Sequence, residues 1–250
     1  MIGEAPMIIY IIERDIRRFF KYRWWMAGLI SMNLADIFIL AIIFNNLVVR
    51  FEYFNFLLPG IVVLALYASA FTIGREVSAE VRRKIHHYYL SLPFSDWDLI
   101  LGRSISGSIR GLIYSTPLLI LAILLSPLPN PYILMYLPPI LFILAMGVSS
   151  LAIFLATVIR NFDAYISVRG LLYFLLMFNS TVFYPLDVLE ILPQPIYVIA
   201  QYNPVSHGAD LMREALQYGV LSFDRIVYLT IFSLVFLGIS SILYLRIIRE

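Results

Sequence analysis

The 250-residue sequence contains no cysteine, which excludes disulfides, thiolate metal sites and thiol chemistry. It also has little charge, because Asp, Glu, Lys and Arg make up 14% of its residues, against about 25% in soluble domains. Hydrophobic residues make up 61%, and the mean hydropathy is +0.87. A chain with this balance is typical of a protein that crosses a membrane several times.

Sequence patterns of common enzymes are missing as well. We find no G-x-x-x-x-G-K-[ST] loop for ATP phosphates, no H-E-x-x-H and no G-x-S-x-G. His86 and His87 are adjacent, so on a helix their side chains would point about 100° apart. We therefore expect no metal site and no catalytic residues in this chain. A net charge of +2 gives no reason to expect nucleic-acid binding.

Long apolar runs predict an all-α polytopic membrane protein with a single transmembrane domain, 1–250. Six runs are long enough to cross a hydrocarbon core of about 30 Å. They cover residues 24–49, 56–74, 104–125, 132–159, 166–184 and 223–245. Most Lys and Arg residues fall on the side that holds both termini, so the positive-inside rule predicts that both termini are cytoplasmic. We expect the plasma membrane as its location.

Two segments outside these spans have patterns of their own. In 7–23, apolar and charged residues occupy opposite faces at helical spacing, which predicts a helix lying in the membrane surface. That helix either only anchors the chain, or its polar face also contacts a cytosolic subunit. Segment 185–219 has an apolar run too short to cross, interrupted by Pro193 and Pro195. We expect a re-entrant hairpin on the outer side, followed by an Asn203-Pro204 turn and a short helix.

A charged segment, 76–103, separates the second and third predicted spans. It reads EVSAEVRRKIHHYYLSLPFSDWDLILGR. Nothing breaks a helix from 76 to 89, Glu80 and Lys84 have the spacing of a helical ion pair, and Pro93 ends the helix. Ser95 is then placed to cap a new helix that enters the membrane. A short rigid helix below two spans is suited to transmit a push, although a solvated hairpin without a role fits the same residues.

Two charges fall well inside predicted spans, away from the span ends. Asp36 lies midway along the first, where an ionised carboxylate costs about 2.5–3.5 kcal/mol on insertion scales. Arg110 lies about two turns into the third. We predict either an Asp36–Arg110 pair across the bundle or a protonated Asp36.

The charged segment resembles the corresponding segment of ABC-2-type exporter permeases. The family pattern of an acidic residue, a Leu, a Pro and a Gly-basic pair matches Glu80, Leu90 or Leu92, Pro93, and Gly102-Arg103. Arg83-Lys84 stands where relatives often carry Gly, which leaves this helix stiffer. The outer loop of that family also resembles 185–219; the matching residues are Pro185, Pro193, Asn203, Pro204 and Arg213.

The resemblance implies partners and roles. It implies two copies of the chain, or the chain and a paralogue, each docked to an ABC ATP-binding subunit that holds ATP and Mg²⁺, with membrane lipids around them. The implied ATPase-coupling residues are Glu76, Glu80, Arg83, Lys84 and His87, and more weakly Arg14, Arg17 and Arg18. The implied substrate pathway contains Leu66, Tyr67, Phe71, Phe174, Phe178, Asn179, Thr181 and Phe183, although ordinary helix packing explains these residues equally well. The hairpin 185–200 would act as the extracellular gate.

The substrate is less defined than the class of protein. The resemblance is greatest to the branch that exports drug-like or lipid-like amphiphiles. Export of a lipid-linked polysaccharide is an alternative, because 38 aromatic residues could line a sugar path (3 Trp, 17 Tyr and 18 Phe). An ion-conducting or scaffold membrane protein that works without an ATPase is the alternative of another class.

Overall fold

The computed structural model describes residues 7–21, 24, 27, 28, 31, 35, 39, 53–83, 85, 96–191 and 193–249. Within these ranges the secondary structure is helical and no strand occurs. Four helical segments are long and apolar enough to cross a membrane: Tyr53–Arg82, Trp97–Leu125, Pro131–Val158 and Phe223–Arg246. The chain is an all-α polytopic membrane protein, as predicted.

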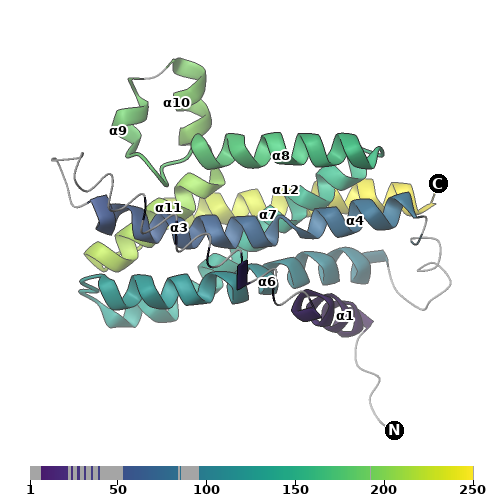
Figure 1. Ribbon diagram of the computed structural model, residues 1–250, viewed down its shortest axis with the longest axis horizontal. Coiled ribbons are helices and arrows are strands. Elements are labelled where there is room, and N and C mark those ends of the chain that lie inside the picture. The colour runs from purple at the N-terminus through teal and green to yellow at the C-terminus, as the bar shows by residue number, and fades with distance from the viewer. Residues whose placement is uncertain are drawn as a thin grey trace, which may run out of the picture.

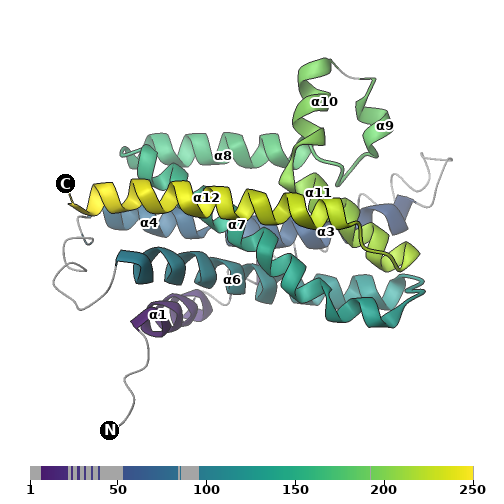
Figure 2. The same ribbon diagram turned by 180° about the vertical axis from the view of Figure 1, so that it is seen from behind.

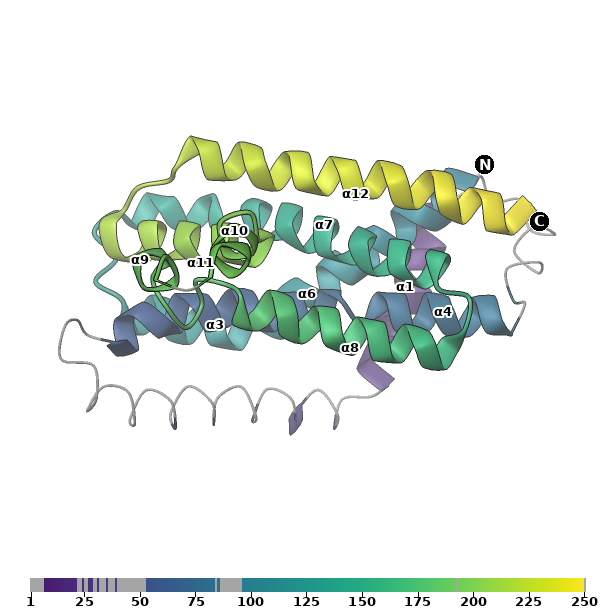
Figure 3. The same cartoon turned by 90° about the horizontal axis from the view of Figure 1, so that it is seen from above.

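The helices form a bundle around α7. In chain order they are α1 Met7–Lys21, α3 Tyr53–Ala70, α4 Ile73–Arg82, α6 Asp96–Leu125, η1 Pro131–Met135, α7 Leu137–Val158, α8 Phe162–Phe178, α9 Leu186–Leu189, α10 Gln194–Gln201, α11 Pro204–Arg213, η2 Glu214–Tyr218 and α12 Phe223–Arg249. Helices α3 and α4 run nearly end to end, with α6 along one side and α8 along the other (Figure 1). Helix α7 packs against α4, α6 and α12, and α12 covers the opposite face (Figures 2 and 3).

Helix α3 is buried on nearly all sides because it is apolar on all sides. Its neighbours α6, α7 and α11 cover it, so it forms the centre of the core. By contrast, α1 is strongly amphipathic and lies across the end of the bundle against α6 (Figure 1).

The two ends of the bundle differ. Helix α1, the first turns of α6 and α8 and the last turns of α12 lie at one end (Figure 1). Helices α9, α10 and α11 lie at the other end, where α9 and α10 project from the bundle (Figure 2). This arrangement is compatible with the predicted topology; which end faces the cytoplasm stays a prediction.

Several predicted boundaries need correction. Helix α6 begins at Asp96, directly after the Ser95 that was predicted to cap it, so the helix starts before the predicted span 104–125. The helix predicted over 76–89 ends at Arg82 in α4. Helix α8 ends at Phe178, so 179–184 form turns, and its 17 residues span about 25 Å. The first predicted span, 24–49, lies almost entirely outside the described residues.

Candidate functional site

Helix α1 is fixed to the bundle by a narrow stripe of its own residues. Ile11, Asp15 and Phe19 follow one another at intervals of four, and all three are buried. Gly102 of α6 allows the close approach, since a Cβ atom there would lie 3.0 Å from Cγ2 of Ile11. The carboxylate of Asp15 therefore lies within the contact between α1 and α6.

Asp15 is fully buried, with an exposed fraction of 0%. Its carboxylate lies 3.3 Å from Nη1 of Arg103 and 2.8 Å from Nη2 of Arg14. The hydroxyl of Ser106 donates a hydrogen bond to Oδ2 at 3.0 Å. Burial raises the pKa of Asp15, but the charges of Arg103, Arg14 and Arg110 outweigh burial and hold that pKa below its ordinary value. Asp15 is therefore ionised at neutral pH.

Two glutamates of α4 complete this cluster, which we name the α1 network and define as Asp15, Glu76, Glu80, Arg103 and Arg110. Arg103 pairs with Glu80 through Nη2. Arg110 lies 2.6 Å from Oε1 of Glu76 through Nη1, and its Nη2 donates to the backbone carbonyl of Asp15. The network therefore ties α1, α4 and α6 to one another by charge-assisted hydrogen bonds.

Arg18 contacts the α1 network at its solvent-exposed edge. Its Nη1 lies 3.6 Å from Oε1 of Glu80 and 3.9 Å from Oε2 of Glu76. Unlike the residues inside, the Arg18 side chain is 42% exposed. One face of α1 thus reaches both the buried carboxylates and the surface.

The α1 network corrects one prediction and bears on a second. Glu80 was expected on a water-exposed docking surface, but it is only 6% exposed because Arg103 holds it inside the bundle. The predicted partner of Arg110 was Asp36, which lies outside the described residues. Among the described residues, Arg110 pairs with Glu76, because α4 lies beside this part of α6, and the Asp36–Arg110 pair stays a prediction.

The other predicted coupling residues lie around this end of the bundle. Arg83 follows α4 and is exposed, and Arg17 is exposed on the outer face of α1, where it pairs with Glu13. Lys84 and His87 lie outside the described residues. Exposed cations thus surround a buried charge cluster at one end of the molecule.

A second buried charge lies at the opposite end of the bundle. Arg213 of α11 donates from Nε to the carbonyl of Phe56 at 2.8 Å, and from Nη2 to the carbonyls of Thr181 and Val182 at 2.6 and 3.0 Å. Its Nη1 lies 2.8 Å from Asp210. Burial lowers the pKa of Arg213 to about 10, which still leaves it charged at neutral pH. This side chain joins the start of α3 to the turn after α8.

Asn203 and Pro204 join the hairpin of α9 and α10 to the same region. Asn203 caps α11 by accepting from the backbone N–H of Val205, and its Nδ2 donates to the carbonyls of Leu176 and Asn179 at 2.7 and 2.8 Å. Pro204 occupies the first turn of α11, where the missing N–H costs nothing. The predicted Asn-Pro turn therefore also holds the end of α8 to the start of α11.

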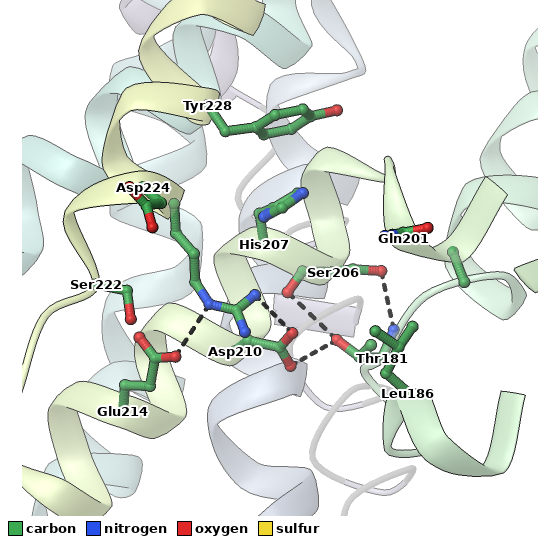
Figure 4. Close-up of a pocket in the computed structure, with 12 residues that line it drawn as sticks. Thr181, Leu186, Gln201, Ser206, His207, Asp210, Glu214, Ser222, Asp224 and Tyr228 are labelled. Carbon is green, nitrogen blue, oxygen red and sulfur yellow. Dashed lines mark hydrogen bonds and ion pairs between the residues drawn. The ribbon is translucent and has the colours of Figure 1, made fainter. Parts of the chain in front are cut away.

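A polar cavity of about 480 Å³ opens beside these residues. Among its lining residues, Asp210 accepts a hydrogen bond from Thr181 at 2.8 Å and lies 2.8 Å from Arg225 (Figure 4). The rings of His207 and Tyr228 stack with centroids 3.9 Å apart. Pro185 precedes α9 and Pro193 precedes α10, so both lie in the hairpin beside this cavity.

The predicted pathway residues fall into two sets. Leu66, Tyr67 and Phe71 are fully buried within the chain, packed in the core. Phe174 and Phe178 are about half exposed on α8, with rings stacked at 6.1 Å, and Phe183 continues the row at 6.0 Å from Phe178.

Thr181 and Asn179 belong to the turn after α8. Thr181 is buried against Ser206 and Asp210, and the backbone carbonyl of Asn179 accepts from Asn203. An aromatic row on α8 therefore ends at a hydrogen-bonded turn. Whether any of these residues lines a pathway stays a prediction.

Comparison with protein families decides the class. A model of the ABC-2 type transporter family matches residues 9–217. The chain belongs to the ABC-2 type transporter family. The match covers most of the chain, from α1 to η2, and thus includes both buried charge networks. No curated protein matches the chain. As a membrane component of ABC transporters, the chain belongs to a family that usually pairs with ABC ATP-binding subunits.

Sequence reasoning missed Asp15, Ser106, Asp210 and Arg225. The signal for Asp15 was present, because it stands between Ile11 and Phe19 on one helical stripe. That stripe was not chosen, since Ile8, Ile12 and Ile16 form a second apolar stripe beside it. Arg225 and Asp210 are separated by 15 residues, so nothing local in the sequence indicates their contact.

Proposed function

We propose that this chain is the permease subunit of an ATP-driven exporter, in which two copies, or one copy and a paralogue, form the pathway. Each copy would bind one ABC ATP-binding subunit that holds ATP and Mg²⁺. The α1 network supports this proposal most strongly. It joins α1 at the bundle end to both α4 and α6 through fully or nearly buried charges.

The mechanical argument follows from the cost of separating these charges. Removing one member of a buried ion pair costs about 3–5 kcal/mol, since the remaining charge is left without a partner. A displacement of α1 or of the end of α4 would therefore carry α6 with it instead of breaking the contacts. The partner would contact exposed cations such as Arg17 and Arg83, and the network would pass the motion to the spans.

The outer hairpin would then open or close the path. Arg213 and Asn203 hold the end of α8 to α3 and α11, so a tilt of α3 changes the position of the hairpin that carries Pro185 and Pro193. The exposed aromatic row on α8 suits a drug-like or lipid-like amphiphile that moves along an apolar surface. The same row favours a lipid-linked polysaccharide as the second candidate, because flat aromatic rings pack against sugar faces.

Reconstitution with the ATP-binding subunit tests the proposal. The complex is purified in lipid nanodiscs, and both subunit association and ATP turnover are measured. We expect Arg83→Ala, an exposed change, to weaken association. We expect Glu80→Gln, a buried change, to leave association intact but to lower ATP turnover several-fold. Asp224→Ala at the opposite end of the bundle is the control, expected to change neither; if Glu80→Gln behaves like that control, the α1 network does not couple the subunits.

A further inference from the structure

Helix α8 runs antiparallel to α3 and α4, and the residues of α8 that face them recur at regular intervals. Tyr165, Arg169 and Tyr173 share one stripe of α8 at intervals of four. Tyr173 stacks on Tyr67 with ring centroids 5.1 Å apart, and the guanidinium of Arg169 lies 5.4 Å from the ring centre of Phe71. We name this contact the α8 seam.

The α8 seam continues toward the end of the bundle that carries α1. A Cβ atom at Gly74 would lie 2.5 Å from the hydroxyl of Tyr165, so only glycine leaves room for that hydroxyl. Beyond it, the guanidinium of Arg82 lies 4.7 Å from the ring centre of Phe162. Aromatic rings and arginines therefore alternate along its length.

Among the described residues, no carboxylate neutralises the arginine at the centre of the α8 seam, Arg169. In the described part of the chain, the ion pairs within 4.0 Å involve arginines 14, 17, 18, 103, 110, 213 and 225. Among the described residues, Arg75, Arg82 and Arg169 have none; Arg75 and Arg82 are exposed, so Arg169 is the one of the three that lies partly inside the bundle. The contrast with the α1 network is sharp, because there every buried arginine faces a carboxylate. A cation within a membrane bundle is costly unless it is paired, which makes an unpaired one an indicator of a ligand.

Arg169 is also one of three residues of the α8 seam whose buried donors lack acceptors. Among the described residues, its Nε and the hydroxyls of Tyr67 and Tyr165 are buried polar atoms without a hydrogen-bond partner. Tyr67 and Tyr165 are both fully buried, and the charge of Arg169 acts on both hydroxyls. Unsatisfied buried polar groups are rare, and three of them around one guanidinium need a common explanation.

We propose that the α8 seam is a binding site for the oxyanion of an anionic amphiphile, with Arg169 as its principal ligand. An oxyanion accepts hydrogen bonds only, so it satisfies a guanidinium and two phenol hydroxyls together. The aromatic row from Tyr173 to Phe178 continues from this site along α8, where an acyl or isoprenoid chain would lie. These donors are buried in the structure, so the seam would have to open for the anion to enter.

This inference rests on the proposed function and names the chemistry of its substrate. The oxyanion has two possible sources: the transported amphiphile itself, or a phospholipid of the surrounding leaflet. Both present the same phosphate chemistry, so the experiment separates them by competition.

The probe is dodecyl phosphate, titrated by calorimetry into the complex in phosphatidylcholine nanodiscs, with empty nanodiscs as the blank. We expect saturable binding that Arg169→Gln weakens at least about tenfold and Tyr165→Phe about threefold. Arg169→Lys should recover part of the loss, because it keeps the charge but not the fork of donors. Arg160→Gln is the matched control: it removes an exposed cation just before α8 and should leave the affinity unchanged. Dodecyl maltoside and dodecyltrimethylammonium, which lack the oxyanion, should not compete.

Replacing phosphatidylcholine with phosphatidylglycerol separates the two sources. If the site binds a lipid of the leaflet, phosphatidylglycerol should compete and weaken dodecyl phosphate binding to the wild type but not to Arg169→Gln. If the site binds the transported amphiphile, the lipid exchange should leave binding unchanged, and dodecyl phosphate should raise ATP turnover. Equal binding by wild type and Arg169→Gln overturns the proposal. So does recovery of binding in Arg169→Gln/Asp36→Asn, which would show that Arg169 serves to neutralise a carboxylate of the chain. An intact complex that hydrolyses ATP but fails these tests refutes the oxyanion site alone.

Discussion

Asp15 should contribute more to stability than any other residue of α1. Its carboxylate is completely buried and contacts Arg103, Arg14 and Ser106. Asp15→Ala removes the carboxylate and leaves the guanidinium of Arg103 with one buried partner fewer, so we expect a loss of about 3 kcal/mol in the free energy of unfolding. The assay is reversible unfolding in mixed micelles, followed by helical circular dichroism.

A neighbouring acidic residue provides the control. Glu13 is on the same helix but its side chain is 46% exposed, and it pairs with Arg17 across one turn. Exposed pairs of this kind contribute about 0.3–0.5 kcal/mol, so Glu13→Ala should hardly change the free energy of unfolding.

The contribution of Asp15 to the free energy of unfolding depends on pH with a definite sign. The pKa of Asp15 is lower in the folded protein than in the unfolded chain. Its contribution is therefore complete above about pH 3.9 and is lost as the pH falls through the folded pKa. Equal losses for Asp15→Ala and Glu13→Ala would refute the reasoning, because they would mean that burial of the carboxylate does not matter.

Three further predictions concern other parts of the bundle. Asn203→Ala should cost about 1–3 kcal/mol in the free energy of unfolding, since it removes a helix cap and two buried hydrogen bonds; helix unfolding in mixed micelles measures it. Gly74→Ala should cost about 1–3 kcal/mol, because its Cβ would lie 2.4 Å from a carbonyl oxygen, whereas Gly238→Ala meets open space and should be neutral or slightly stabilising in the same assay. Burial and the charge of Arg225 lower the pKa of His207. The contribution of His207 to the free energy of unfolding is thus complete above about pH 6.5 and is lost as the pH falls. The unfolding midpoint should therefore differ less between pH 8 and pH 5 in His207→Gln than in the wild type.

The architecture followed from periodicity and composition. Apolar runs of about 20 residues predict spans with little ambiguity, and the structure confirms the all-α membrane class. The amphipathic pattern of 7–23 predicted α1, which runs over Met7–Lys21. The Asn203-Pro204 turn was predicted because the cap and the proline act locally. Local signals of this kind can be read without knowing the fold.

The charge networks could not be predicted because their members are distant in sequence. Glu80 has the spacing of a surface ion pair with Lys84, and only the packing of α4 on α6 shows that Arg103 is its partner. Arg169 has no distinguishing pattern in the sequence, where it is one more basic residue near a span end. Its lack of a carboxylate partner is a property of the assembled seam. Sequence patterns indicated where charges stand, and the tertiary contacts decide which are neutralised.

Purification of the tagged chain from its native membrane tests the central claim most directly. If the chain is an exporter permease, an ABC ATP-binding subunit should copurify in equal amount, identified by mass spectrometry, and the complex in lipid should hydrolyse ATP with vanadate sensitivity. Arg83→Ala should reduce the amount of that subunit. A chain that purifies without any ATP-binding subunit and conducts ions in planar bilayers would contradict the account.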